Sequence, residues 1–159
     1  MTAAAYTRQS LGWQLAEYVS AARPADIPEA VRHEATRSFV NWIGCGLGGA
    51  QDVIARTAAT ALCEFSGKPE ATLIGMKKKA DVLTAAMINC ISSGAHAFDD
   101  THAEMVLHPA GPIAAAIMAL AERMPIRGED FMLALVLGLE VECRLTRAIA
   151  VPPLSLIHI

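Results

Sequence analysis

Apolar residues recur every three or four positions along most of the chain, which is the spacing of one face of an α-helix. Ser10 and Asp81 each precede such a stretch and can cap it, because a short polar side chain accepts a hydrogen bond from a free amide of the first turn. The segments predicted to be helical are 11–23, 28–43, 52–65, 82–93, 109–123 and 128–150. The pattern therefore predicts an all-α domain of about six helices.

Turn residues separate the predicted helices. Asp26 precedes Pro28 in a capping-box-like arrangement, so the second helix is expected to start there. The run Ser-Gly-Lys-Pro at 66–69 ends the third helix. Between that turn and Gly75, segment 71–74 is short and contains Thr and Ile, which fits a small strand or an extended crossing.

The composition limits the kinds of partner. Hydrophobic residues make up 53% of the chain and charged residues 18%, so some apolar surface is expected to meet another protein surface. The net charge is -3 without a basic stripe, which argues against binding of nucleic acid. The longest apolar runs, 109–121 and 131–139, are shorter than the ~20 residues that cross a bilayer, and residues 1–20 lack a signal-peptide core. We expect a cytoplasmic protein without a membrane partner.

Residues 44–49 spell GxGxxG, a motif whose glycines let a strand-to-helix turn approach a pyrophosphate in dinucleotide-binding folds. Here the preceding segment has helical spacing, and no alternation of strands and helices surrounds it. A close helix crossing or a helix end explains these glycines better.

Three lysines and four cysteines have ordinary structural explanations. Lys77, Lys78 and Lys79 could attract an anion, but they lie between Gly75 and Asp81, where a solvated turn would carry charge in any case.

The cysteines occur singly inside apolar segments without a CxxC pair, which is typical of buried thiols rather than of zinc ligands or disulfides. They are Cys45, Cys63, Cys90 and Cys143.

The loop 94–108 concentrates the groups that could do chemistry. Its histidines and carboxylates are His96, Asp99, Asp100, His102, Glu104 and His108. Their spacing matches neither HExxH nor an EF-hand loop, so no metal site is predicted. Two interpretations remain open from the residue types alone. One is acid–base chemistry on a carboxylate substrate, with a histidine moving the proton; the other is a polar loop with capping aspartates and solvated histidines.

The order of residues in this loop resembles that of a known family. The loop reads Phe98, Asp99, Asp100, Thr101 and His102, followed by His108, Pro109 and an alanine-rich helix at 112–123. This spelling closely resembles the signature loop of the MmgE/PrpD family. The sequences at 29–32, 41–44 and 71–75 also resemble early segments of that family. The resemblance covers residues 10–150.

The resemblance implies an enzyme that moves protons beside the carboxylates of small polycarboxylic acids. Family members include 2-methylcitrate dehydratase, cis-aconitate decarboxylase and iminodisuccinate epimerase. A lyase acting on a substrate such as 2-methylcitrate or cis-aconitate is therefore expected, with an isomerase of the iminodisuccinate type as the alternative. The resemblance also implies a helical domain, a smaller α+β lid domain with the active site between them, a homodimer, and no cofactor.

Carried over to this chain, the resemblance assigns roles within the loop. His108 would be the proton donor or acceptor, with Asp100 and Thr101 as further catalytic residues. Asp99 and His102 would contact the substrate, His102 as the less direct neighbour. The chain departs from the family pattern at Ala97, where the family often has an aspartate.

Residues 1–153 are expected to form an incomplete helical domain, without the lid. Residues 154–159 read Leu-Ser-Leu-Ile-His-Ile, which matches the translation of an adapter used in transposase-based sequencing libraries, so this tail is expected to be foreign and is excluded from functional argument. A rival from another class is a non-catalytic helical module that pairs its apolar faces with another chain.

Overall fold

The computed structural model of the protein describes residues 10–149, which form a mostly helical domain. Within this range there are six α-helices and one short antiparallel hairpin. The helices are α1 (Leu11–Ala21), α2 (Glu29–Gly49), α3 (Val53–Cys63), α4 (Val82–Gly94), α5 (Ala110–Arg123) and α6 (Gly128–Ile149). The prediction of a helical domain is confirmed. The suspected foreign tail, 154–159, lies outside the described residues.

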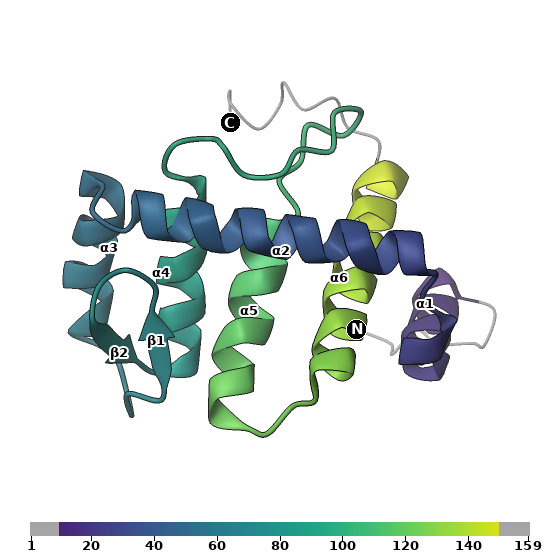
Figure 1. Cartoon of the computed structure of the whole chain (residues 1–159), viewed down its shortest axis with the longest axis horizontal. Coiled ribbons are helices and arrows are strands. Elements are labelled where there is room, and N and C mark those ends of the chain that lie inside the picture. The colour runs from purple at the N-terminus through teal and green to yellow at the C-terminus, as the bar shows by residue number, and fades with distance from the viewer. Residues whose placement is uncertain (1–9, 150–159) are drawn as a thin grey trace, which may run out of the picture.

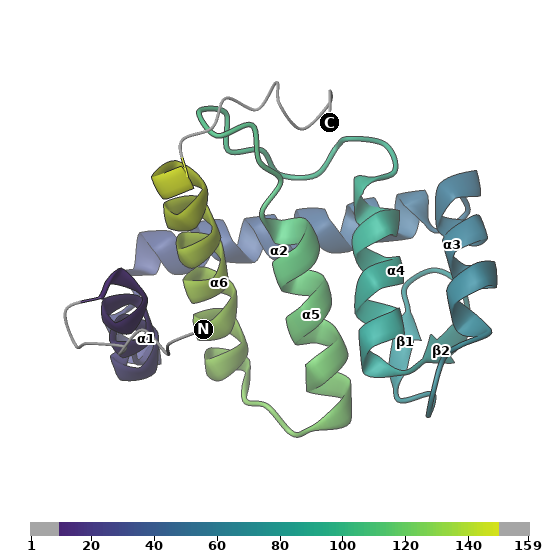
Figure 2. The same cartoon turned by 180° about the vertical axis from the view of Figure 1, so that it is seen from behind.

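The long helix α2 organises the domain, because it runs across α4, α5 and α6, which stand side by side (Figures 1 and 2). Its Trp42 is fully buried and stacks on Phe39, with ring centroids 5.7 Å apart. Phe39 in turn meets Phe131 of α6 edge to face at 4.9 Å. Ala114 of α5 and Leu135 of α6 complete the buried cluster beneath α2. Aromatic burial on α2 therefore holds the row of helices together.

Two of the glycines at 44–49 allow close packing. A Cβ atom on Gly49, the last residue of α2, would overlap the carbonyl oxygen of Ser92 in α4 and come within 3.0 Å of the Ala95 Cβ atom. A Cβ atom on Gly46 would lie 3.6 Å from the Ile74 side chain. No strand leads into these glycines, since α2 runs through all of them. The interpretation as a helix crossing and a helix end is confirmed.

The hairpin consists of β1 (Ala71–Leu73) and β2 (Lys78–Ala80), with Ala71 opposite Ala80. The possible strand at 71–74 is therefore confirmed as β1. The expectation of a solvated turn at 77–79 is wrong for Lys78 and Lys79, which lie in β2. Lys79 also forms a 3.1 Å ion pair with Glu122 of α5. A three-residue strand of two lysines and an alanine shows too little alternation to be seen in the sequence.

The predicted helix caps are confirmed at Ser10 and Asp81 and wrong at Asp26, and the structure adds a cap at Asp52. The side chains of Ser10, Asp52 and Asp81 each accept a hydrogen bond from an amide in the first turn of their helix. Asp26 instead accepts from the Arg23 amide at 2.9 Å, which closes the short 3-10 turn η1 (Pro24–Asp26). Helix α2 begins at Glu29 without a side-chain cap, because the intervening proline turn has separated Asp26 from its amides.

All four cysteines are free thiols and are partly buried, in agreement with the expectation that they pack as small apolar groups. Burial is the main cause that raises the pKa of the Cys90 thiol, with the charge of Asp99 as the second. Across residues 10–149, none of the helices is both long and apolar enough to span a membrane.

Replacing Gly49 by Ala should destabilise the domain, because the new methyl group would overlap the Ser92 carbonyl group of α4. We expect a loss of about 1–3 kcal/mol in the free energy of unfolding, measured by urea denaturation. Gly44→Ala is the matched control in the same helix, since nothing lies within 4 Å of its Cβ position. That change should be neutral or stabilising by up to about 1 kcal/mol. Equal effects of the two changes would contradict the close crossing.

Candidate active site

The loop that joins α4 to α5, residues 95–109, passes over one end of the helix row (Figure 1). We call it the connecting loop. Its second half is closed by a bridge in which the His102 amide donates to the Leu107 carbonyl oxygen at 2.8 Å. Ala97 and Val106 have positive φ angles of 54° and 49°. Positive φ is costly for residues other than glycine, above all for a β-branched one, and such strain is often found at functional sites.

The carboxylate of Asp100 anchors the connecting loop to two helices. Its Oδ2 atom accepts from the Ser38 hydroxyl of α2 at 3.0 Å, and its Oδ1 atom accepts from the Ala110 amide at the start of α5 at 3.1 Å. A second tie to α2 comes from the Asn41 side-chain amide, which donates to the Phe98 carbonyl oxygen at 3.2 Å. A carboxylate at a helix N-terminus is stabilised by the free amides and by the helix dipole.

The imidazole of His108 is oriented by this anchored segment. Its Nδ1 atom lies 3.0 Å from the Asp100 carbonyl oxygen, 3.3 Å from the Thr101 hydroxyl oxygen and 3.5 Å from Asp99 Oδ1. A carbonyl oxygen can only accept, so Nδ1 carries the hydrogen in this contact and the neutral ring presents Nε2 as an acceptor. The Asp99 side chain is 7% exposed, while the ring is 45% exposed. The buried carboxylate and the accessible ring are close enough to form an ion pair whenever the imidazole carries a proton on both nitrogens.

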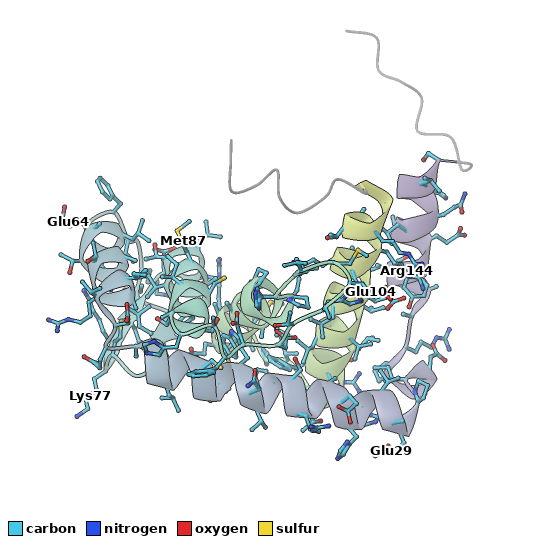
Figure 3. All side chains as sticks on the ribbon, turned by 90° about the horizontal axis from the view of Figure 1, so that it is seen from above. Glu29, Glu64, Lys77, Met87, Glu104 and Arg144 are labelled. Atoms are coloured by element: carbon cyan, nitrogen blue, oxygen red, sulfur yellow. The ribbon has the colours of Figure 1, made fainter. Side chains whose placement is uncertain are left out.

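Four of the five predicted site residues therefore come together: Asp99, Asp100, Thr101 and His108. The fifth, His102, has no recorded contact with them in the described part of the chain. It lines a separate cavity of about 490 Å³ between the connecting loop and the end of α6, and its Nδ1 atom is buried without a hydrogen-bond partner. Glu104 and Arg144 lie near one another at this cavity (Figure 3).

Sequence reasoning missed three residues of the site. Ser38 and Asn41 hold the connecting loop from more than 50 positions away, and Glu142 of α6 lies within electrostatic range of Asp100. Burial raises the pKa of the Glu142 carboxyl, and the charge of Asp100 raises it further. The sequence does contain one signal that could have identified these polar residues, because they interrupt otherwise apolar helix faces at helical spacing.

A smaller cavity of about 290 Å³ lies on the α2 side of the connecting loop. It is lined by Asn41, Gly44, Cys45, Gly48, Ser93, His96 and Phe98. Burial, followed by the charges of Asp99 and Asp100, raises the pKa of the Cys45 thiol and so opposes formation of a nucleophilic thiolate there. Among residues 10–149, no three His, Cys, Asp or Glu side chains converge as metal ligands would. The side chains that do converge are those of Asp99, Asp100, Thr101 and His108.

Fold and site together define the amino-terminal helical part of a family of enzymes. Residues 13–158 match the model of the MmgE/PrpD N-terminal domain, and the chain belongs to the MmgE/PrpD family. A cis-aconitate decarboxylase-like protein of Aspergillus oryzae is 30% identical over 142 residues, which cover 85% of this chain and 30% of that protein. The cis-aconitate decarboxylase of Aspergillus terreus is 30% identical over 129 residues, covering 78% and 26%. The chain thus spans less than a third of these relatives.

Replacing Asp100 by Ala should release the connecting loop, because the Ser38 hydroxyl and the Ala110 amide both lose their acceptor. We expect the free energy of unfolding to fall by about 1–3 kcal/mol in chemical denaturation. Glu104→Ala removes a carboxylate from the exposed part of the same loop and should change stability by less than about 0.5 kcal/mol. If the two variants were equally stable, Asp100 would not be the anchor.

Proposed function

We propose that this chain is part of a lyase, a dehydratase or decarboxylase that acts on small polycarboxylic acids such as 2-methylcitrate or cis-aconitate. The observation that carries the proposal is the orientation of His108. Its Nδ1 atom is held 3.0 Å from the Asp100 carbonyl oxygen, while the ring remains 45% exposed. A histidine held at one nitrogen and open at the other is suited to exchange a proton with a bound ligand.

The neighbours of His108 have distinct proposed roles. Asp99, 3.5 Å from the ring, would line the substrate side of the site, and the Thr101 hydroxyl would help to orient the ring. Asp100 would act through the backbone, because its carboxylate fixes the segment whose carbonyl group accepts from His108. His102 would contribute to substrate binding from the adjacent cavity.

Both proposed reactions need one group that moves a proton at carbon. In dehydration, a base removes the proton beside a carboxylate, and the hydroxyl group leaves with another proton as water. In decarboxylation, carbon dioxide leaves and the carbon that it leaves takes a proton from an acid. Such a group contributes about 10²–10⁴-fold to a rate, and substrate orientation supplies much of the rest. The proposal includes no metal and no organic cofactor.

We also propose that the complete enzyme is longer than this chain. Residues 1–153 would be the first part of a helical domain, followed in the complete enzyme by a lid domain that supplies cations for the substrate carboxylates. The share of the fungal relatives that this chain covers, 26–30%, supports this division. We further propose a homodimer, since Phe65, Leu83 and Val53 leave apolar side chains exposed. A cytoplasmic location is a separate part of the proposal.

Two alternatives lead to different observations. An isomerase of the iminodisuccinate type would use the same proton carrier but return the proton to the opposite face of the carbon. A non-catalytic helical module is favoured by apolar side chains exposed just after α3 and on α4, where Phe65 is 87% and Leu83 is 81% exposed. The module would bind another chain without exchanging any substrate proton.

Replacing His108 by Ala in the complete enzyme should lower kcat about a hundredfold or more, because no other exposed imidazole is held in this way among the described residues. Turnover would be followed by NMR in D2O with cis-aconitate, 2-methylcitrate and iminodisuccinate offered separately. Loss of carbon dioxide, loss of water, or inversion with deuterium uptake distinguishes the three reactions.

His33→Ala serves as the control, since His33 lies exposed on α2, where its recorded partner is the adjacent Glu34. It should leave kcat unchanged. Activity of the His108 variant within about threefold of the unmodified enzyme would remove His108 as the proton carrier. Absence of turnover and of deuterium uptake with every acid would favour the helical module.

A further inference from the structure

Helix α1 leaves its apolar side chains largely uncovered. None of its 11 residues is buried, and Leu11 and Tyr18 are 80% and 48% exposed. An isolated helix of this length is marginal in water, and helices in proteins are stabilised mainly by packing an apolar face against other elements. Helix α1 therefore needs a packing partner beyond those that residues 10–149 supply.

An apolar groove lies between α1 and α6. It consists of two cavities, of about 440 and 530 Å³, which meet at Tyr18 because that side chain lines both. The larger cavity also reaches η1 and the start of α2. Large apolar side chains of the two helices line this space, and we call it the α1–α6 groove. They include Leu11, Leu15, Tyr18, Leu133, Leu137 and Leu145.

The shape and lining of the groove fit one face of a helix. On α6 the groove extends from Leu133 to Ala148, which is about 22 Å along the helix axis and matches a helix of about 15 residues. The two charged residues of α6 that line it, Glu140 and Arg144, form an ion pair with each other. An amphipathic helix with apolar side chains at helical spacing is therefore a better occupant than an ion or a charged peptide.

The position of the groove indicates where such a helix comes from. Helices α4, α5 and α6 follow one another in the sequence and stand side by side in that order, and the groove lies at the free edge beyond α6 (Figures 1 and 2). Helices that are consecutive in a chain usually pack as neighbours. The matched family domain is an N-terminal one, and the match covers 26–30% of the Aspergillus relatives, so most of their length lies outside it.

A second copy of the chain is a less suitable occupant. The exposed side chains from which we propose a homodimer belong to the start of α3, the residues just after it and α4. Helix α3 stands at the opposite end of the domain from α1 (Figure 1). A partner bound at that end would leave the α1–α6 groove uncovered.

We propose that the α1–α6 groove receives the helix that follows α6 in the complete polypeptide. This rests on the proposal that the complete enzyme is longer than this chain, and not on the reaction that it catalyses. Because this helix starts beyond the C-terminal end of α6, it runs back along the groove from Leu145 toward Leu133. Arg144 lines both the groove and the cavity of His102, so the first turn of the docked helix lies near the candidate site.

Photo-crosslinking in the complete protein tests the occupant. The photoreactive residue p-benzoylphenylalanine replaces Leu15 on α1 in one variant and Leu145 on α6 in another, and the crosslinked peptides are identified by mass spectrometry. From both positions we expect crosslinks within one polypeptide, to the first helix after α6. Glu17 is the matched control position on α1, because it lines neither cavity, and it should give no such crosslink. Leu145 still provides the test if the Leu15 variant does not fold.

A third position gives the direction of the docked helix. Crosslinks from Leu133 should map to later residues of that helix than crosslinks from Leu145. The reverse order, crosslinks to any other segment, crosslinks between two polypeptides, or none from any groove position would overturn the proposal. These results do not depend on turnover. An inactive protein could still give the expected crosslinks, and crosslinks between two copies would leave the proposed reaction untouched.

Discussion

The carboxylate of Asp100 is the interaction on which the candidate site depends. It bonds the Ser38 hydroxyl of α2 and the Ala110 amide of α5, so one side chain joins the loop to two helices that the core has already packed together. The carbonyl oxygen of Asp100 then accepts a hydrogen bond from Nδ1 of His108. Because the imidazole is positioned through backbone atoms of an anchored residue, its orientation follows from the packing of α2 on α5 rather than from the loop itself.

This arrangement gives the site a marked charge imbalance. Asp99 and Asp100 lie in the connecting loop, and Asp100 acts electrostatically on Glu142 of α6. Among the described residues, His108 is the one group with a recorded contact to these aspartates that can become positive. A polycarboxylate ligand would be repelled unless cations are brought to it from elsewhere. Arg144, at the neighbouring cavity, is occupied by Glu140. The charges thus agree with the proposal that cations from another part of the protein complete the site.

The parts of the fold that the sequence predicted are those determined by local interactions. The caps at Ser10 and Asp81 and the proline that opens α5 act within one helical turn, so spacing alone locates them. Strand β2 escaped prediction because its pairing with β1 is the main reason that Lys78 and Lys79 are extended. The tie between Ser38 and Asp100 spans 62 positions and exists only once α2 lies across the helix row. Residue types identified the loop, but no local rule could name its anchors.

The glycines of α2 connect the fold to the site. At Gly49 the absence of a side chain lets α2 approach the backbone of α4 at Ser92. About three helical turns earlier, that same path brings Ser38 and Asn41 to the connecting loop, which begins just after α4. A helix held further from α4 would carry both side chains away from their acceptors. Gly49 therefore supports the candidate site indirectly, because it allows the close approach of α2 to α4 on which the Asp100 anchor relies.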